Sequence, residues 1–199
     1  MKGDGARKTM GRVFLGVLLG IVLMPIAVLG WLRFGHVPVA VADTPFPKEQ
    51  LITGMALNAR IGRELVKAPP IQADEGNLLA GAHIYSEKCA TCHGFHGKPS
   101  VFGAHMFPDA PPLWEAHHHG TETKIGVSDD PPGETYWKVA NGIRLTGMPA
   151  YKNLLTDTEM WQVSLLLATA DKPLPPAAVA ILHGESSAPA SAGVETNKK

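Results

Sequence analysis

Two cysteines and a histidine, Cys89, Cys92 and His93, stand at the spacing C-x-x-C-H in the stretch CATCH. Two thiols three positions apart can each add to one of the two vinyl groups of a haem, and this spacing is the attachment signature of c-type haem. The imidazole that follows the second thiol can then bind the iron as its proximal ligand. The chain of 199 residues has no other cysteine, so no second site competes for these thiols. We therefore expect one covalent haem c here.

Three other interpretations of the cysteines are weaker. A thioredoxin-like redox pair requires a βαβ setting, and no strand pattern lies near Cys89. Half of a zinc site requires a second ligand pair at fixed spacing, and the chain has no second C-x-x-C. A structural disulfide between residues this close is rare. Haem attachment remains the favoured interpretation.

The sixth iron ligand requires a soft or imidazole donor later in the chain, and Met148 is the candidate. It stands in Gly147-Met148-Pro149, where the glycine allows the backbone to pass close to the haem and the proline stiffens the turn behind the sulfur. A methionine flanked in this way is hard to explain as a core residue. Residues without a comparable setting remain as alternatives: Met106, His96 and His105.

The elements that position these ligands are predicted to be helices. The first is predicted to begin at Asn77 as N-cap and to run into Cys89. Its buried side is marked by Leu78, Leu79, Ala82 and Tyr85. A short helix over Gly133–Asn141 ends at Gly142. The last helix begins at the capping box Thr156-x-x-Glu159 and ends by Ala170, before Pro173, Pro175 and Pro176. Residues 95–133 are predicted to be loop with at most short helices.

The N-terminal region carries an uncharged apolar run over residues 13–32, long enough as a helix to span the hydrocarbon of a bilayer. Basic residues precede it, which places residues 1–12 in the cytoplasm by the positive-inside rule. Trp31 is then at the far interface. A cleavable signal peptide ending at Ala40-Val41-Ala42 is the competing interpretation. We favour an uncleaved anchor, because the apolar run is longer than a usual signal core and lies ten residues from Ala42.

Residues 33–75 are predicted to be a linker that contains one helix. Prolines oppose regular helix up to residue 48, whereas apolar residues recur at steps of three and four over residues 49–67. Those residues are Leu51, Ile52, Met55, Ala59, Gly62 and Val66. The helix is either an additional element packed on the domain that follows or a docking helix for a partner.

The chain resembles the class I monohaem c-type cytochromes over about residues 76–172. The matching segments, in the order and spacing of that family, are Ala80–Tyr85, Cys89–Gly94, Asn141–Ile143, Gly147–Tyr151 and a later helix with Trp161. The resemblance implies attachment of the haem outside the cytoplasmic membrane. It also implies that the second ring nitrogen of His93 donates to a proline carbonyl in a Pro-x-Leu stretch. Pro111-Pro112-Leu113 matches that stretch, so Pro111 is the expected partner of His93 and Leu113 an expected haem contact; a loop shaped by the two prolines is the alternative.

Other polar and aromatic residues have weaker functional interpretations. The run His117–His119 invites a metal site, but adjacent residues rarely point three rings at one ion, so a solvated loop or a propionate contact is favoured. Arg144, Trp137 and Tyr151 could hydrogen-bond a haem propionate, or the aromatic rings could simply pack in the core. By the family resemblance, Trp161 is expected to pack against Gly81 where the first and last helices cross.

The expected fold is therefore all-α, a small cytochrome c-like haem domain over residues 76–183 with a single N-terminal transmembrane helix and a disordered tail from residue 184. The expected function is one-electron transfer, without catalysis, on the outer face of the cytoplasmic membrane. Expected partners are a dehydrogenase, a quinol-oxidising complex or a terminal oxidase.

The first 33 residues hold five of the 18 basic residues against one acid. The rest of the chain is therefore mildly acidic and gives no support for nucleic-acid binding. Two alternatives are a haem subunit of a larger respiratory complex or membrane dehydrogenase and, if Met148 binds weakly, a gas sensor or peroxidase.

Overall fold

The computed structural model describes residues 3–184 and, within them, the side chains of all residues except 3–8 and 119. The chain divides into two compact units, residues 1–47 and 48–199, and each is described by itself. Apart from Gly184, the tail that we expected to be disordered lies outside the described residues.

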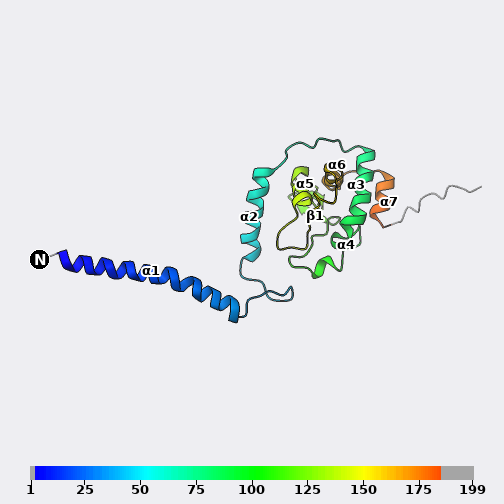
Figure 1. The fold of residues 1–199 in the computed structure, drawn as a ribbon. Coiled ribbons are helices and arrows are strands. Elements are labelled where there is room, and N and C mark those ends of the chain that lie inside the picture. Colours follow the sequence, from blue (N-terminus) through cyan, green and yellow to red (C-terminus); the bar gives the residue numbers. More distant parts are fainter. Residues whose placement is uncertain (1–2, 185–199) are drawn as a thin grey trace, which may run out of the picture. The chain divides into compact units, whose positions relative to one another are not determined.

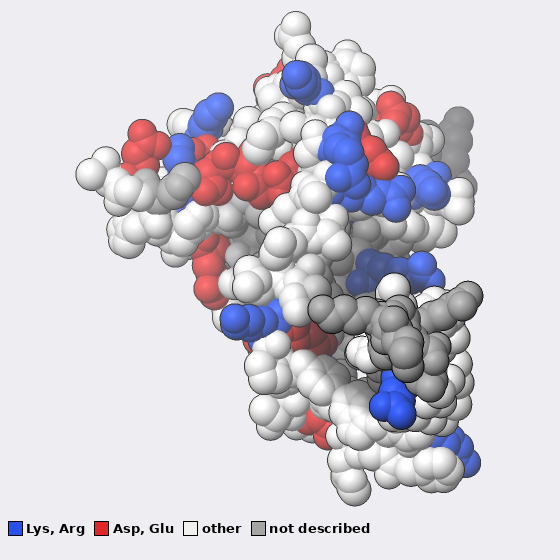
Figure 2. Space-filling view, turned by 90° about the vertical axis from the view of Figure 1, so that its left-hand side faces the viewer, with Lys and Arg blue, Asp and Glu red and all other residues white. Residues whose placement is uncertain are grey.

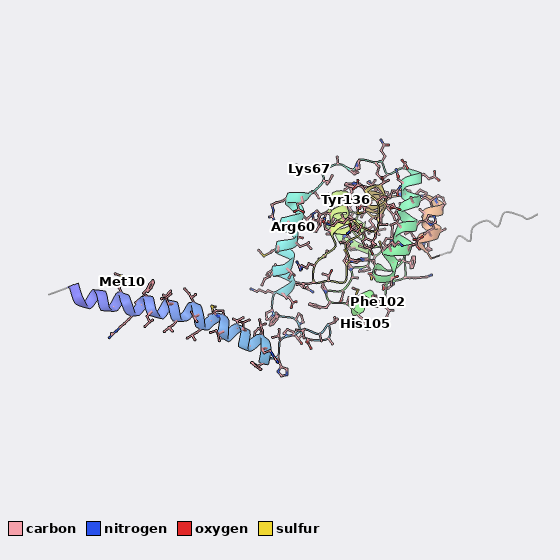
Figure 3. All side chains as sticks on the ribbon, in the orientation of Figure 1. Met10, Arg60, Lys67, Phe102, His105 and Tyr136 are labelled. Atoms are coloured by element: carbon pink, nitrogen blue, oxygen red, sulfur yellow. The ribbon has the colours of Figure 1, made fainter. Side chains whose placement is uncertain are left out.

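The first unit is dominated by α1, which spans Gly3–Phe34 and contains Pro25. Within it, Thr9–Phe34 is long and apolar enough to cross a membrane, and no other helix in the described part of the chain is. These 26 residues extend about 39 Å, and most of their apolar side chains are exposed (Figure 3). The predicted apolar helix is confirmed as a candidate membrane span. Residues 35–48 follow without regular structure, and the ring of Phe46 lies 6.0 Å from that of Trp31.

The second unit is mostly helical, as predicted (Figure 1). Its helices are α2 (Glu49–Glu64), α3 (Glu75–Lys88), α4 (Ala90–His93), the 3-10 turn η1 (Gly103–His105), α5 (Pro132–Asn141), α6 (Asp157–Ala168) and α7 (Pro176–Leu182). Helix α3 packs against α6 and α7, and α6 also packs against α5. The core between them holds Ala82, Tyr85, Val163, Leu166 and Leu182.

A short hairpin interrupts the segment that we expected to be loop with at most short helices. Strands β1 (Ala116–His119) and β2 (Glu122–Ile125) pair antiparallel, with Ala116 opposite Ile125 and His119 opposite Glu122. The two-residue turn Gly120–Thr121 joins them. The expectation was wrong here because these strands are largely polar and lack the alternation of apolar residues that signals a half-buried strand.

The helices differ from the sequence prediction in two respects and agree with it at one cap. The N-cap of α3 is Asp74 and not Asn77: a carboxylate oxygen of Asp74 accepts the backbone N–H of Asn77 at 2.9 Å. The predicted capping box at Thr156 and Glu159 is present. Helix α7 was not predicted; it begins with Pro176 in its first turn, where a proline costs no hydrogen bond, and buries Ala178, Ile181 and Leu182.

Helices α3 and α6 cross at Gly81, but the residue expected to meet it lies elsewhere. A Cβ atom at Gly81 would lie 2.5 Å from the carbonyl oxygen of Gln162 and 3.2 Å from Cβ of Leu166, so only glycine permits this approach. Trp161 instead stacks on Tyr136, with ring centroids 4.2 Å apart and planes 12° apart. The crossing was predicted correctly and its aromatic partner was not.

Candidate haem site

A cavity of about 270 Å³ opens among α2, α5, α6 and the loops of the second unit. The two cysteines, His93 and Met148 all line it. Most of its other lining side chains are apolar and include Leu57, Leu113, Val127, Val139, Ile143, Val163 and Leu167. An apolar wall with two thiols and two potential iron ligands fits a covalently attached haem.

The two cysteines are presented by a tight turn at the end of α3. The backbone N–H of Cys89 still bonds to the carbonyl of Tyr85, and α4 then makes a single turn that ends at Gly94, with φ of 77°. A side chain at Gly94 would also meet the carbonyl oxygen of Lys98 at 2.7 Å. Gly94 therefore allows the chain to leave this turn.

The thiols are free and partly buried. Burial, and next the nearby Cys92 sulfur, raise the pKa of Cys89 to about 12. A thioredoxin-like pair requires a lowered thiol pKa, so this environment is the opposite of what such redox chemistry needs. Cys89 is held as a neutral thiol beside the cavity.

His93 is oriented by a single hydrogen bond. Its Nδ1 lies 2.8 Å from the carbonyl oxygen of Pro111, the partner that the family resemblance implied. A carbonyl only accepts, so the hydrogen belongs on Nδ1 and the lone pair on Nε2. Burial lowers the pKa of His93, against a smaller opposing effect of the Pro111 bond. The neutral tautomer that can bind a metal is therefore the favoured state.

Met148 reaches the same cavity from a tightly wound loop. Its N–H donates to Oγ1 of Thr146 at 3.1 Å, and the Thr146 hydroxyl donates to the carbonyl of Ile143 at 2.7 Å. The carbonyl of Met148 accepts the N–H of Ile143 at 3.3 Å. Local bonds thus fix the backbone that carries the thioether.

Comparison with known proteins identifies the domain that holds this cavity. A protein-family model described as cytochrome c oxidase, cbb3-type, subunit III matches residues 76–165. The chain contains a c-type cytochrome domain. Its cytochrome domain carries covalently attached haem c and transfers electrons through it. No curated protein and no solved structure matches the chain.

Among the alternative ligands, only Met106 lines the cavity of the cytochrome domain. Its methyl group packs directly on Gly147, 1.6 Å from where a Cβ atom would stand. His105 is bonded through Nδ1 to the carbonyl of Val101 at 2.8 Å, and His96 packs on His183 with ring centroids 4.8 Å apart. Phe102 and His105 lie at the edge of the unit (Figure 3). The position of Met106 beside the Met148 loop could not be read from its sequence context.

The aromatic residues considered for propionate binding have protein partners instead. The indole N–H of Trp137 donates to Glu64 at 2.8 Å, and the hydroxyl of Tyr151 donates to the carbonyl of Lys88 at 2.8 Å. Arg144 is exposed. These contacts favour a structural role for both aromatics.

The three histidines lie on β1, where the side chains of the neighbouring His117 and His118 point to opposite faces. Nε2 of His117 lies 3.5 Å from a carboxylate oxygen of Asp129. No group of three or more histidine, cysteine or acidic side chains that could hold a metal occurs among the described residues. The hairpin geometry therefore separates the imidazoles of His117 and His118.

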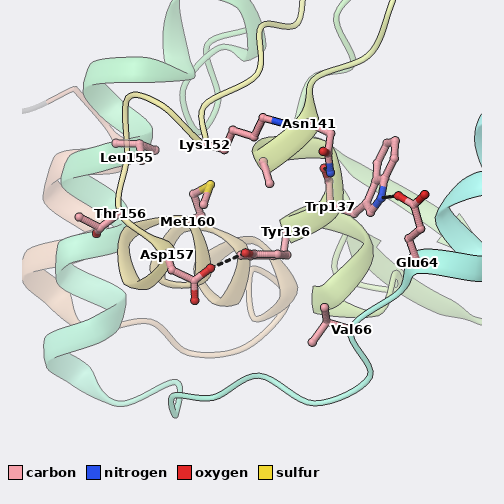
Figure 4. A pocket seen from close by; sticks show the side chains of 11 residues that line it. Glu64, Val66, Tyr136, Trp137, Asn141, Lys152, Leu155, Thr156, Asp157 and Met160 are labelled. Carbon is pink, nitrogen blue, oxygen red and sulfur yellow. Dashed lines mark hydrogen bonds between the residues drawn. The ribbon is translucent and has the colours of Figure 1, made fainter.

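A second, shallower pocket of about 600 Å³ lies between the end of α2, α5 and the start of α6 (Figure 4). Its polar groups are bonded to one another: Tyr136 donates to Asp157, and Trp137 donates to Glu64. It contains neither cysteine nor either candidate ligand. The first cavity is therefore the candidate haem site.

Proposed function

We propose that this cytochrome is a one-electron carrier with His93 and Met148 as axial ligands, tethered by α1 to the outer face of the cytoplasmic membrane. The observation that carries the proposal is that both residues line one apolar cavity, next to both cysteines. With both axial positions filled by protein, no iron position is left for a substrate. One-electron transfer is then the chemistry that remains.

The residues have distinct tasks in this proposal. When bound, haem supplies an iron that alternates between two oxidation states. Cys89 and Cys92 hold it by two thioethers. The bond from His93 to Pro111 fixes the imidazole plane and makes it more basic. The thioether of Met148 favours the reduced state relative to a second imidazole, and the apolar wall, including Leu113, keeps water away from the ring.

The absorption spectrum of the oxidised, purified protein tests the ligand assignment. Methionine on the iron gives a sulfur-to-iron charge-transfer band at the red end of the spectrum. A spectrum that lacks this band, together with rapid binding of carbon monoxide by the reduced protein, contradicts the assignment. The function is then that of a gas sensor or a peroxidase.

The location proposed for the chain rests on α1 and on the residues around it. The basic residues before the span favour a cytoplasmic N-terminus, with the cytochrome domain on the periplasmic side in a respiratory-type chain. Intact protein should remain in membranes after a high-salt wash. A mature N-terminus at Asp43 contradicts the tether, because it means that Ala40–Ala42 is cleaved.

A second candidate is a haem-bearing subunit of a larger respiratory complex. The description of the matched family model, a subunit of a terminal oxidase, favours it. Solubilisation in mild detergent followed by gel filtration distinguishes the two. A free carrier elutes near its own mass of 21.2 kDa plus detergent, whereas a subunit co-elutes with a dehydrogenase, a quinol-oxidising complex or an oxidase.

A further inference from the structure

Helix α2 exposes an apolar stripe. Leu51, Ile52 and Met55 are 58%, 65% and 65% exposed, and Ala59 and Gly62 continue the stripe at steps of four and three residues. Apolar residues at this spacing share one face of a helix. The stripe is thus the face that the sequence pattern predicted, and it is left without a protein partner within the described residues.

A different face of α2 holds the helix on the cytochrome domain. Ile61 is 3% exposed, Leu57 lines the haem cavity, and Glu64 accepts the indole N–H of Trp137 at 2.8 Å. These three residues recur at steps of four and three, on the side away from the stripe. The contacts fix the rotation of α2 and direct Leu51, Ile52 and Met55 outward.

The position of the stripe along the chain indicates what covers it. Only residues 35–48 separate α2 from the candidate membrane span, a segment that reaches at most about 50 Å when extended. Exposed apolar side chains continue through this segment, with Val39 87% and Val41 58% exposed. Exposed apolar residues therefore recur in the sequence between the span and α2.

The charges around α2 fit an anionic lipid surface. Residues 48–67 carry four basic side chains against two acidic ones, and one of the acids, Glu64, is already bonded to Trp137 and Arg60. Arg60 lies on α2 in Figure 3, and Figure 2 shows basic and acidic side chains interspersed with uncharged surface. An apolar stripe flanked by basic residues is typical of a helix that lies in the membrane interface.

We propose that α2 lies in the headgroup region of the bilayer through Leu51, Ile52 and Met55, and so docks the cytochrome domain on the membrane. This proposal rests on the tether proposed for α1. Because Leu57 on the other side of α2 lines the haem cavity, the cavity wall lies about one helix diameter, about 10 Å, from the lipid. A redox partner that can approach this cavity has its own redox centre close to the membrane surface.

Spin labels on the full-length holoprotein in lipid vesicles test the docking. The two native cysteines are consumed by the haem, so a label reacts only with an introduced thiol. We compare Ile52→Cys and Met55→Cys with Thr53→Cys, an exposed position on the same turn but off the stripe. Labels at 52 and 55 should be accessible to oxygen and several-fold less accessible than the label at 53 to a water-soluble nickel chelate. Vesicles of phosphatidylcholine alone show how far apolar insertion is sufficient for this protection. Vesicles that also contain the anionic phosphatidylglycerol show what charge attraction adds.

Two results overturn the proposal. Equal nickel accessibility at 52, 53 and 55 means that the stripe faces water. Protection of 52 and 55 from both oxygen and nickel means that a protein surface covers them, from a second copy or a partner. A label at Leu23→Cys, within the candidate span, distinguishes failure of the docking from failure of the tether: if it is oxygen-accessible and nickel-protected, the tether holds and the docking alone fails.

Discussion

Tyr85 donates its phenolic hydroxyl to the carbonyl oxygen of Gly94 at 2.7 Å and thereby ties α3 to the end of the haem attachment turn. Tyr85 is fully buried, and its ring and that of Trp114 meet edge to face at a centroid distance of 5.5 Å. Burial, and next the nearby Cys89 sulfur, raise the pKa of Tyr85, so the hydroxyl stays protonated as a donor. The bond connects the packing of the core to the position of His93.

The change Tyr85→Phe should lower the free energy of unfolding by about 1–3 kcal/mol, because it leaves a buried carbonyl without its donor. Guanidinium unfolding of the oxidised holoprotein measures this. Tyr151→Phe is the matched control: it removes a hydroxyl bonded to the carbonyl of Lys88 at a position that water can reach. An equal loss in both variants contradicts a special role for the buried bond.

The change Gly81→Ala should destabilise the fold by about 1–3 kcal/mol, as overpacking does. The new methyl group would stand 2.5 Å from the carbonyl oxygen of Gln162, which is backbone and cannot move aside alone. Gly54→Ala in α2 is the control, since nothing lies within 4 Å of that position; we expect no loss there. Thermal unfolding followed at the haem absorption band compares the two.

Sequence reasoning succeeded where the determining chemistry is local. The attachment turn, the capping box at Thr156 and the end of α5 at Gly142 each depend on residues within a few positions of one another. The bond from Tyr85 to Gly94 and the approach of Gly81 to Gln162 depend on how helices meet, which no local pattern contains. Helix α2 shows the same limit, because its spacing predicted an apolar face but could not say whether protein or something else covers it.

The bond between Glu64 and Trp137 should make the packing of α2 against α5 depend on pH. The indole donor, the largest effect, lowers the pKa of Glu64 from its ordinary value of 4.5, with Arg60 contributing and desolvation opposing. A lowered pKa in the folded state means that the contribution is complete above pH 4.5 and is lost as the pH falls through the folded value. The indole N–H resonance of Trp137 should therefore titrate with a midpoint below 4.5. In Glu64→Gln this titration should be absent, and a midpoint at or above 4.5 in the wild type contradicts the bond.

Haem attachment depends on both thiols. The double variant Cys89→Ser, Cys92→Ser should give no haem staining after denaturing electrophoresis, because no thioether remains. Each single variant retains at most one link. Met148→Ala is the control and should stain fully, since it leaves both thiols in place. Staining of the double variant rules out these two residues as the attachment points.

Met148 decides whether the protein is a carrier or binds ligands. With Met148 on the iron, the haem should be low-spin in both oxidation states and indifferent to carbon monoxide when reduced. Met148→His should stay low-spin but have a lower reduction potential, because imidazole stabilises oxidised iron better than a thioether does. Redox titration and absorption spectra measure both properties.

Met148→Ala should open the sixth position and give high-spin iron that binds carbon monoxide readily. Met106 complicates this expectation, because its side chain lines the same cavity and packs on Gly147. If the single variant keeps low-spin iron, the double variant Met106→Ala, Met148→Ala shows whether Met106 has taken the vacated position. Met106→Ala alone should leave the charge-transfer band and the potential nearly unchanged, since Met148 remains bound. Loss of the band in Met106→Ala, with Met148 intact, means instead that Met106 is the ligand.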